Sequence, residues 1–247
     1  MRLPRDWLSS GVLYWGKSVH WSFQIKDDNR SCLFRKPEDR LMDFQGSSFK
    51  EDAMAHVFNP ALLHRLDDPN RLDYQNPLKL IEKMHPYPNT SMMDFGAGAG
   101  YFTFPIAKSF PENSPVHVID IQKEMLDHLI KRAKDQDLSG RIQPHLLETF
   151  PLSVPDGSVG LAWMVNVFHE IDDRKSALSE IFRILAPGAS LFIVDWKPEE
   201  TPMGPPLSER VPEVEIITSL LEAGFALIRS WEIYSMHLVV EAQKGMA

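Results

Sequence analysis

From residue 90 onward, short apolar runs alternate with segments in which apolar residues recur every three or four positions. The runs have the length of strands, and the periodic segments have the spacing of amphipathic helices. Strands and helices in alternation build a parallel sheet with helices on both faces. The expected strands are 91–95, 116–119, 142–147, 159–165 and 191–194, and the expected helices are 99–109, 122–134, 173–186 and 212–223.

The end of the chain adds two further strands, 225–232 and 235–242. They are joined too tightly for a crossover helix, so they must run antiparallel to each other. The strand at 142–147 contains Pro144, which suits the edge of a sheet. We therefore predict an α/β fold: a Rossmann-like, seven-stranded, mostly parallel sheet with an antiparallel C-terminal hairpin and helices on both faces.

Three zones divide the chain. Residues 1–50 lack sustained periodicity and are interpreted as an N-terminal extension. Two alternatives stay open for it: a strand or hairpin within 14–25, or a disordered or upstream segment that follows from a wrongly assigned start. Residues 51–89 are a linker rich in Asp, Asn and Pro with a helix over 76–84, and they are expected to form part of the substrate side. Residues 90–247 are the α/β domain.

Bulk composition limits the partners. A net charge of −8 argues against nucleic acid, because phosphate binding draws on clustered Lys and Arg. A single cysteine, Cys32, permits neither an internal disulfide nor a cysteine-rich metal site, and the histidines lack ligand-like spacing, so no metal is expected. No apolar run approaches the roughly 20 residues of a membrane span. The N-terminus lacks a signal-peptide core, and a cytoplasmic location is expected.

The glycine-rich segment 94–101 follows a strand and opens a helix. Glycines permit a tight turn and let a ligand approach the backbone closely. Twenty residues past Gly100, at the end of the next strand, lies Asp120. An acid there can accept hydrogen bonds from both ribose hydroxyls of a nucleoside. Loop and acid together predict a nucleoside-containing ligand.

The details of the loop favour one kind of nucleoside. A dinucleotide fingerprint, G-x-G-x-x-G, anchored at Gly96 would need glycine at position 101, where the chain has Tyr101. The acid before the loop, Asp94, suits a ligand with an amino group and a sulfonium. It would repel the negative charge of a pyrophosphate. The pattern thus points to S-adenosylmethionine (AdoMet).

From about residue 73 to 242 the chain resembles class I AdoMet-dependent methyltransferases of the ubiquinone/menaquinone-biosynthesis (UbiE-like, type 11) group. The matching segments, in order, are MMDFGAGAGYFTFP, VHVIDIQKEML, LETFPLSVPDGSVGLAWMVNVFHEIDD and ALSEIFRILAPGASLFIVDW. The resemblance implies a transferase with AdoMet as cofactor and makes 90–247 the methyltransferase domain.

The resemblance also implies cofactor contacts in the segments that follow the first four strands of this domain. The glycine loop would line the methionine and ribose parts, and the residues after the second strand would hold the ribose and pack on the adenine. Glu148 stands where the family usually has Asp, and it would border the adenine edge with its neighbour Thr149. The whole expected set is Asp94, Gly96, Ala97, Gly98, Tyr101, Asp120, Ile121, Glu148, Thr149, Asn166 and Val167.

Several of these residues have a second interpretation. Asp120 could be the N-cap of the helix that follows it, and Tyr101 could pack in the first turn of its helix instead of contacting ligand near the methyl group. His169 could be a general base or could close the loop before the next helix. The Gly-Pro-Pro segment 204–206 could be a stiff lid or an ordinary rigid loop.

The expected reaction is transfer of the AdoMet methyl group by in-line displacement to a small or moderately apolar acceptor. The resemblance adds a quinone precursor as one such acceptor. Two alternatives remain: a nucleotide-dependent oxidoreductase on a related fold and a non-catalytic AdoMet-binding regulator. The sequence specifies neither the methylated atom nor the oligomeric state.

Overall fold

The computed structural model describes residues 7–15, 19–26, 32–35, 70–87 and 90–246. The chain divides into two compact units, Met1–Ala53 and Met54–Ala247. The first unit contains an antiparallel sheet of order β1-β2-β3, formed by β1 (Trp7–Trp15), β2 (Val19–Lys26) and β3 (Cys32–Arg35). Residues 51–69 of the predicted linker lie outside the described residues.

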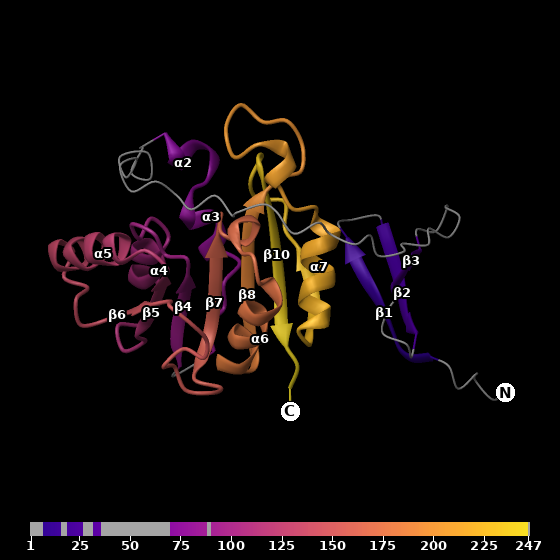
Figure 1. Ribbon diagram of the computed structural model, residues 1–247, viewed down its shortest axis with the longest axis horizontal. Coiled ribbons are helices and arrows are strands. Elements are labelled where there is room, and N and C mark those ends of the chain that lie inside the picture. Colours follow the sequence, from indigo (N-terminus) through magenta and orange to yellow (C-terminus); the bar gives the residue numbers. More distant parts are fainter. Residues whose placement is uncertain (1–6, 16–18, 27–31, 36–69, 88–89, 247) are drawn as a thin grey trace. The chain divides into compact units, whose positions relative to one another are not determined.

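The second unit is built on a seven-stranded sheet of order β6-β5-β4-β7-β8-β10-β9 (Figure 1). Its strands are β4 (Ser91–Phe95), β5 (Val116–Asp120), β6 (Ile142–Leu146), β7 (Val159–Val165), β8 (Leu185–Trp196), β9 (Phe225–Ser230) and β10 (His237–Lys244). β4 pairs in parallel with β5 and β7, and β10 runs antiparallel to both of its neighbours, β8 and β9. The predicted fold class is confirmed, including the edge position of β6.

The helices within the described residues of this unit are α2 (Arg71–Tyr74), α3 (Pro77–Ile81), α4 (Thr103–Ser109), α5 (Lys123–Asp135), α6 (Arg174–Ile184) and α7 (Glu213–Glu222). There are two short 3-10 turns: η2 (Phe168–Glu170) follows β7, and η3 (Leu207–Glu209) precedes α7. Among the described residues, no helix combines the length and the apolar character that crossing a bilayer requires.

Two apolar cores lie on opposite faces of the sheet because successive side chains of a strand point to opposite sides. In β7, Ala162 and Met164 pack with α6 and α7, whereas Leu161 and Trp163 pack with α3, α4 and α5. All four side chains are fully buried. A strand with both faces covered reads as a continuous apolar run, as 159–165 does.

Several predicted boundaries differ from the structure: the helix expected over 76–84, for example, spans Pro77–Ile81. Two of the differences have a clear physical reason. The helix expected from residue 99 begins at Thr103, because Gly96, Gly98 and Gly100 all have positive φ, which a right-handed helix excludes. The helix expected to reach 186 ends at Ile184, and β8 begins at once at Leu185. Pro187 and Gly188 therefore lie inside the strand, where the pairing of β8 with β7 shifts register.

Candidate active site

A cavity of about 650 Å³ opens where β4, β5, β7 and β8 end. Its volume falls within the range typical of small-molecule sites. The carboxyl ends of parallel strands are where open α/β sheets bind their ligands. Most of the residues predicted from the sequence line it: Asp94, Gly96, Ala97, Gly98, Tyr101, Asp120, Ile121, Asn166, Val167 and His169.

The glycine loop is pinned to the end of β5. The amides of Gly96 and Ala97 donate to the carbonyl of Ile119 at 2.8 and 3.0 Å. The amide of Gly98 donates to Oδ2 of Asp120 at 2.8 Å, and the amide of Gln122 donates to Oδ1 at 2.9 Å. The Asp120 side chain thus fixes the loop on one side and the turn into α5 on the other.

This arrangement does not match the N-cap interpretation of Asp120, and the ribose-binding interpretation stays a prediction. The N-cap of α5 is Gln122, which makes no side-chain capping bond. Asp120 lies two residues earlier, only 8% exposed, and it borders the cavity. A carboxylate has about four lone-pair sites, and the backbone amides of Gly98, Ile121 and Gln122 do not use all of them, so acceptor capacity remains for a ligand.

Asp94 lies at the end of β4 beneath the glycine loop and lines the cavity. Its Oδ2 accepts a hydrogen bond from Oγ1 of Thr103 at 2.6 Å. Burial raises the pKa of Asp94 to about 7 in spite of this hydrogen bond. A group with this pKa becomes a carboxylate most readily when a cation enters the cavity.

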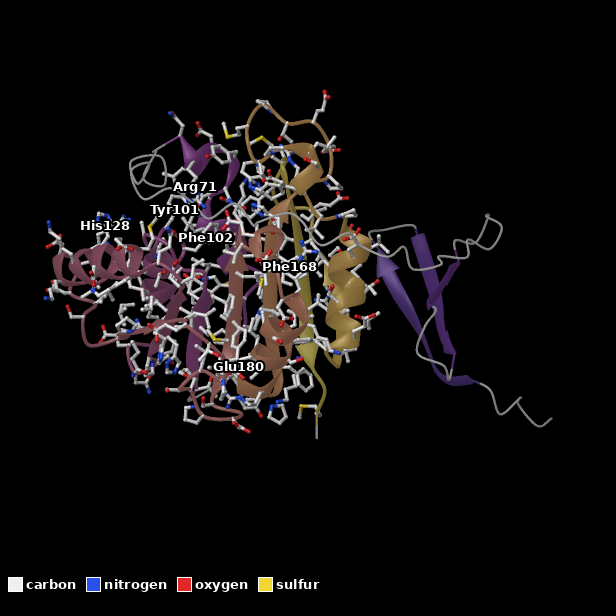
Figure 2. The ribbon with its side chains drawn as sticks, in the orientation of Figure 1. Arg71, Tyr101, Phe102, His128, Phe168 and Glu180 are labelled. Atoms are coloured by element: carbon white, nitrogen blue, oxygen red, sulfur yellow. The ribbon has the colours of Figure 1, made fainter. Side chains whose placement is uncertain are left out.

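A network missed by the sequence analysis joins α2 to the end of β7. The side-chain amides of Gln75 and Asn166 bond reciprocally at 3.1 and 3.3 Å, and Gln75 is fully buried. Arg71 donates twice to Oε1 of Gln75, and its guanidinium carbon lies 4.0 Å from the ring centroid of Tyr101. Figure 2 shows Arg71 beside Tyr101. Only the i, i+4 spacing of Arg71 and Gln75 signals this network in the sequence.

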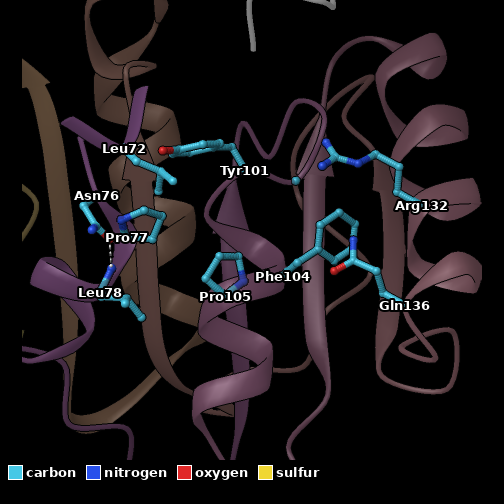
Figure 3. Close-up of a pocket in the computed structure, with 10 residues that line it drawn as sticks. Leu72, Asn76, Pro77, Leu78, Tyr101, Phe104, Pro105, Arg132 and Gln136 are labelled. Atoms are coloured by element: carbon cyan, nitrogen blue, oxygen red, sulfur yellow. Dashed lines mark hydrogen bonds between the residues drawn. The ribbon is translucent and has the colours of Figure 1, made fainter. Parts of the chain in front are cut away.

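Tyr101 is the wall between two cavities. A second cavity, of about 460 Å³, lies between α2, α3 and α4 and is bordered by Arg132 of α5 and by Gln136, which follows that helix (Figure 3). Tyr101 lines both cavities, and its hydroxyl donates to the carbonyl of Gln75 at 3.4 Å. The ring therefore takes part in a ligand-facing wall as well as packing at the start of its helix.

His169 is held by a buried acid that the sequence analysis did not select. Its backbone amide donates to Oδ2 of Asp195 at 3.0 Å, and its Nδ1 lies 2.7 Å from Oδ1. Asp195 is fully buried near the end of β8. Its signal in the sequence is an acid that follows the apolar run 191–194, at the end of the sheet that faces ligands.

Two expected adenine neighbours do not line the cavity. Glu148 and Thr149 are exposed, whereas the residues on either side of them, Leu147 and Phe150, line it. Ile121 is also in the lining and is 56% exposed, as an apolar rim residue would be before a ring covers it. The structure therefore brings apolar side chains to the region where the sequence placed polar ones.

The segment after β8 forms the wall opposite the glycine loop. Trp196, Met203, Gly204 and Pro205 line the cavity. A Cβ on Gly204 would meet the indole of Trp196 at 2.8 Å, so glycine permits this close packing. The guanidinium of Arg210 donates to the carbonyls of Lys197, Glu199, Met203 and Pro205.

Comparison with known proteins gives this arrangement a family. A family profile described as a methyltransferase domain matches residues 92–188. A solved structure of a SAM-dependent methyltransferase from Aquifex aeolicus is 30% identical, with a TM-score of 0.71, and the match covers 76% of this chain and 99% of that one.

Among curated relatives, the ubiquinone/menaquinone biosynthesis C-methyltransferase UbiE of Hydrogenovibrio crunogenus is 23% identical over 47% of this chain and 46% of its own. The 2-methyl-6-phytyl-1,4-hydroquinone methyltransferase of Synechocystis is 28% identical over 44% of this chain and 33% of its own. The chain spans about half or less of the length of these curated relatives.

The fold and the site are those of a nucleoside-binding α/β enzyme. The chain belongs to the AdoMet-dependent methyltransferases, and its curated relatives include UbiE. The predicted family, enzyme class and cofactor are confirmed. The roles of the individual site residues stay predictions.

The buried acids make AdoMet affinity depend on pH. AdoMet carries a net positive charge and favours ionised Asp94 and Glu170, both of which have a pKa raised by burial to about 7. Binding therefore releases protons below that pH, and affinity should rise about three- to tenfold between roughly pH 5.5 and 7.5. Calorimetry over this pH range measures the change in affinity.

Two controls accompany the measurement. S-adenosylhomocysteine lacks the sulfonium, so its affinity should rise less with pH, and Asp94→Asn should reduce the pH dependence of AdoMet affinity. An AdoMet affinity of the wild-type protein that does not change with pH would contradict the prediction.

Proposed function

We propose that the chain transfers the methyl group of AdoMet to a small or moderately apolar acceptor. The observation that carries this proposal is the glycine loop, held by the Asp120 carboxylate at the edge of a cavity of about 650 Å³. The loop leaves backbone next to the ligand, and the carboxylate keeps acceptor sites for the ribose. Family membership supports the same reaction.

In this proposal the cofactor lies across the ends of β4, β5 and β7. Asp94, Gly96, Ala97 and Gly98 would border the methionine part, and Asp120 would hold the ribose. Ile121 would pack on the adenine, with Leu147 and Phe150 as further apolar neighbours in place of direct contacts by Glu148 and Thr149. Asn166, Val167 and Tyr101 would lie near the methyl group.

The chemistry asks for alignment more than for covalent assistance. The sulfonium already makes the methyl carbon electrophilic, and the displacement needs the nucleophile in line with the carbon–sulfur bond. Holding two reactants in such a geometry can lower a barrier by several kcal/mol, roughly 7–11 in the best cases. The segment after β8 forms part of the cavity wall, and where it shields a bound ligand from water it would strengthen the electrostatic interactions there.

The character of the far wall supports the acceptor class. Tyr74, Trp196, Met203 and Pro205 offer aromatic and apolar surface. The curated relatives include enzymes named for ubiquinone/menaquinone biosynthesis and for a phytyl hydroquinone. We propose a quinone-type small molecule as the first acceptor to test. The cytoplasmic location stays a prediction, and the oligomeric state is left open.

Calorimetry with AdoMet, S-adenosylhomocysteine and NADH tests the cofactor side. We expect a micromolar dissociation constant for AdoMet, about −8 kcal/mol, and weak or no binding of NADH. Tight NADH binding without AdoMet binding would instead support the oxidoreductase alternative. Labelled AdoMet with a panel of quinols then tests transfer, since AdoMet binding without transfer to any acceptor is the behaviour of a regulator.

A further inference from the structure

Asp195 fixes which nitrogen of His169 carries a proton. The acid accepts hydrogen bonds from the amide of His169, from Nδ1 of the same residue and from the amide of Trp196, at 3.0, 2.7 and 2.7 Å. A carboxylate is an acceptor only, so Nδ1 must donate its hydrogen. Nε2 of a neutral His169 is then left with a free lone pair.

The Nε2 side of the ring faces a second acid. Nε2 lies 3.8 Å from Oε1 of Glu170, which is beyond a direct hydrogen bond, and both residues line the cavity. The His169 side chain is 7% exposed and that of Glu170 is 32% exposed. Glu170 thus connects a nearly buried imidazole with solvent.

The environment raises the pKa of both groups. Burial lowers the pKa of His169, but the hydrogen bond and charge of Asp195 and the charges of Glu170 and Glu209 raise it, and the net effect is a raised pKa. Burial raises the pKa of Glu170 to about 7, where His169 lowers it and Asp195, Asp120 and Glu209 raise it further. Two neighbouring ionisable groups at this separation can pass a proton between them through one water molecule.

We propose that Nε2 of His169 is the general base of the methyl transfer, that Asp195 is the positioning residue that fixes its tautomer, and that Glu170 relays the proton to solvent. This rests on the proposed function. Nε2 takes the proton from the acceptor's hydroxyl, and the electron pair stays on the acceptor. That nucleophile forms the new bond to the methyl carbon, and the carbon–sulfur pair goes to sulfur, which leaves neutral S-adenosylhomocysteine.

The arrangement also limits the acceptor. An imidazole base removes protons far more readily from hydroxyls of phenol or enol acidity than from aliphatic alcohols. The reacting group should therefore arrive as a phenol- or enol-type hydroxyl. An acceptor that is already an unprotonated nucleophile would not need a general base, so His169 and Asp195 would not contribute to its methylation.

The kinetic test uses the full chain, labelled AdoMet, a series of substituted phenols and the methyl ethers of the same phenols. We expect transfer to the phenols only, with a wild-type kcat that rises with pH through the pKa of His169. His169→Gln should lower kcat roughly 10²–10⁴-fold and abolish that rise, with AdoMet affinity within about threefold of wild type. Exposed His85, replaced in His85→Gln, is the matched control and should change neither.

Asp195→Asn tests the positioning role. No orientation of an asparagine amide accepts from both Nδ1 and the His169 amide, so the tautomer is no longer fixed. We expect a loss in kcat of roughly 10²-fold or more and an altered pH profile. Free imidazole should partly restore turnover in His169→Ala and should not restore it in Asp195→Asn. Thermal unfolding shows whether each variant is folded.

Nitrogen NMR of histidine-labelled full chain with S-adenosylhomocysteine decides the matter without an acceptor. We expect a neutral His169 with hydrogen on Nδ1 that gains a second proton as the pH is lowered. The opposite tautomer, a single protonation state from about pH 5 to 9, or transfer to the ethers alone overturns the proposal. If AdoMet and S-adenosylhomocysteine fail to bind, the proposed function itself is wrong. If both bind normally but one of these three results is obtained, only the proposed role of His169 as general base is wrong.

Discussion

Gly96→Ala is expected to weaken AdoMet binding about 30-fold or more. Gly96 has φ of +75°, and a Cβ there would lie 2.4 Å from Cγ2 of Val167. A left-handed conformation at a non-glycine residue costs about 1–2 kcal/mol, and overpacking typically costs about 1–3 kcal/mol. The loop relaxes in the empty protein and must be strained again to accept ligand, so at least about 2 kcal/mol is lost from binding.

Two variants separate the causes. Gly157 also has positive φ, +63°, but a Cβ there has no neighbour within 4 Å, and it lies outside the cavity lining. Gly157→Ala should lower thermal stability slightly and leave calorimetric AdoMet affinity unchanged. Adding Val167→Ala to Gly96→Ala should recover the part of the loss due to the clash. Native AdoMet affinity in Gly96→Ala would mean that the loop does not bind the cofactor.

Asp120→Ala is expected to reduce AdoMet affinity at least tenfold. The change removes the acceptor for the amides of Gly98 and Gln122 and removes a carboxylate from the cavity wall. Hydrogen bonds to a charged group contribute about 1.5–3 kcal/mol, which corresponds to roughly 10- to 150-fold in affinity. Calorimetry with AdoMet, together with thermal unfolding, measures both consequences.

A ligand without ribose hydroxyls distinguishes direct contact from loop support. We expect Asp120→Ala to cost much less affinity for 2′,3′-dideoxy S-adenosylhomocysteine than for S-adenosylhomocysteine. The dideoxy ligand has no ribose hydroxyls, so it makes no hydrogen bond to Asp120 that the substitution could remove. This difference is the coupling energy of a double-mutant cycle between side chain and ligand. Equal losses for both ligands would assign Asp120 to holding the loop alone.

The pattern of apolar residues in the sequence predicted those elements whose structure depends mainly on their own residues. The strands 91–95 and 159–165 have the predicted boundaries, because each is an apolar run bounded by turn-forming residues. The start of β8 was not predictable in this way. Leu185 pairs with Val159 across the sheet, and that partner, together with the positive φ of Gly188, keeps the chain extended through Pro187.

The residues of the candidate site also differ in whether local sequence identifies them. Sequence reasoning found the residues of the glycine loop and Asp120, since each lies directly after a strand that the pattern identifies. It missed Gln75, whose partner Asn166 is 91 positions away, and Asp195, whose partner His169 is 26 positions away. Such pairs exist only once the sheet has assembled, so no window of sequence contains both members.

The four carbonyls held by Arg210 bear on how a ligand enters. The bonds span Lys197 to Pro205, so one planar guanidinium ties together most of the wall formed after β8. A segment whose carbonyls all bond to one side chain is expected to move as one unit rather than residue by residue. Exchange of cofactor and product would then be gated by a single cooperative event, on the microsecond-to-millisecond scale of such motions.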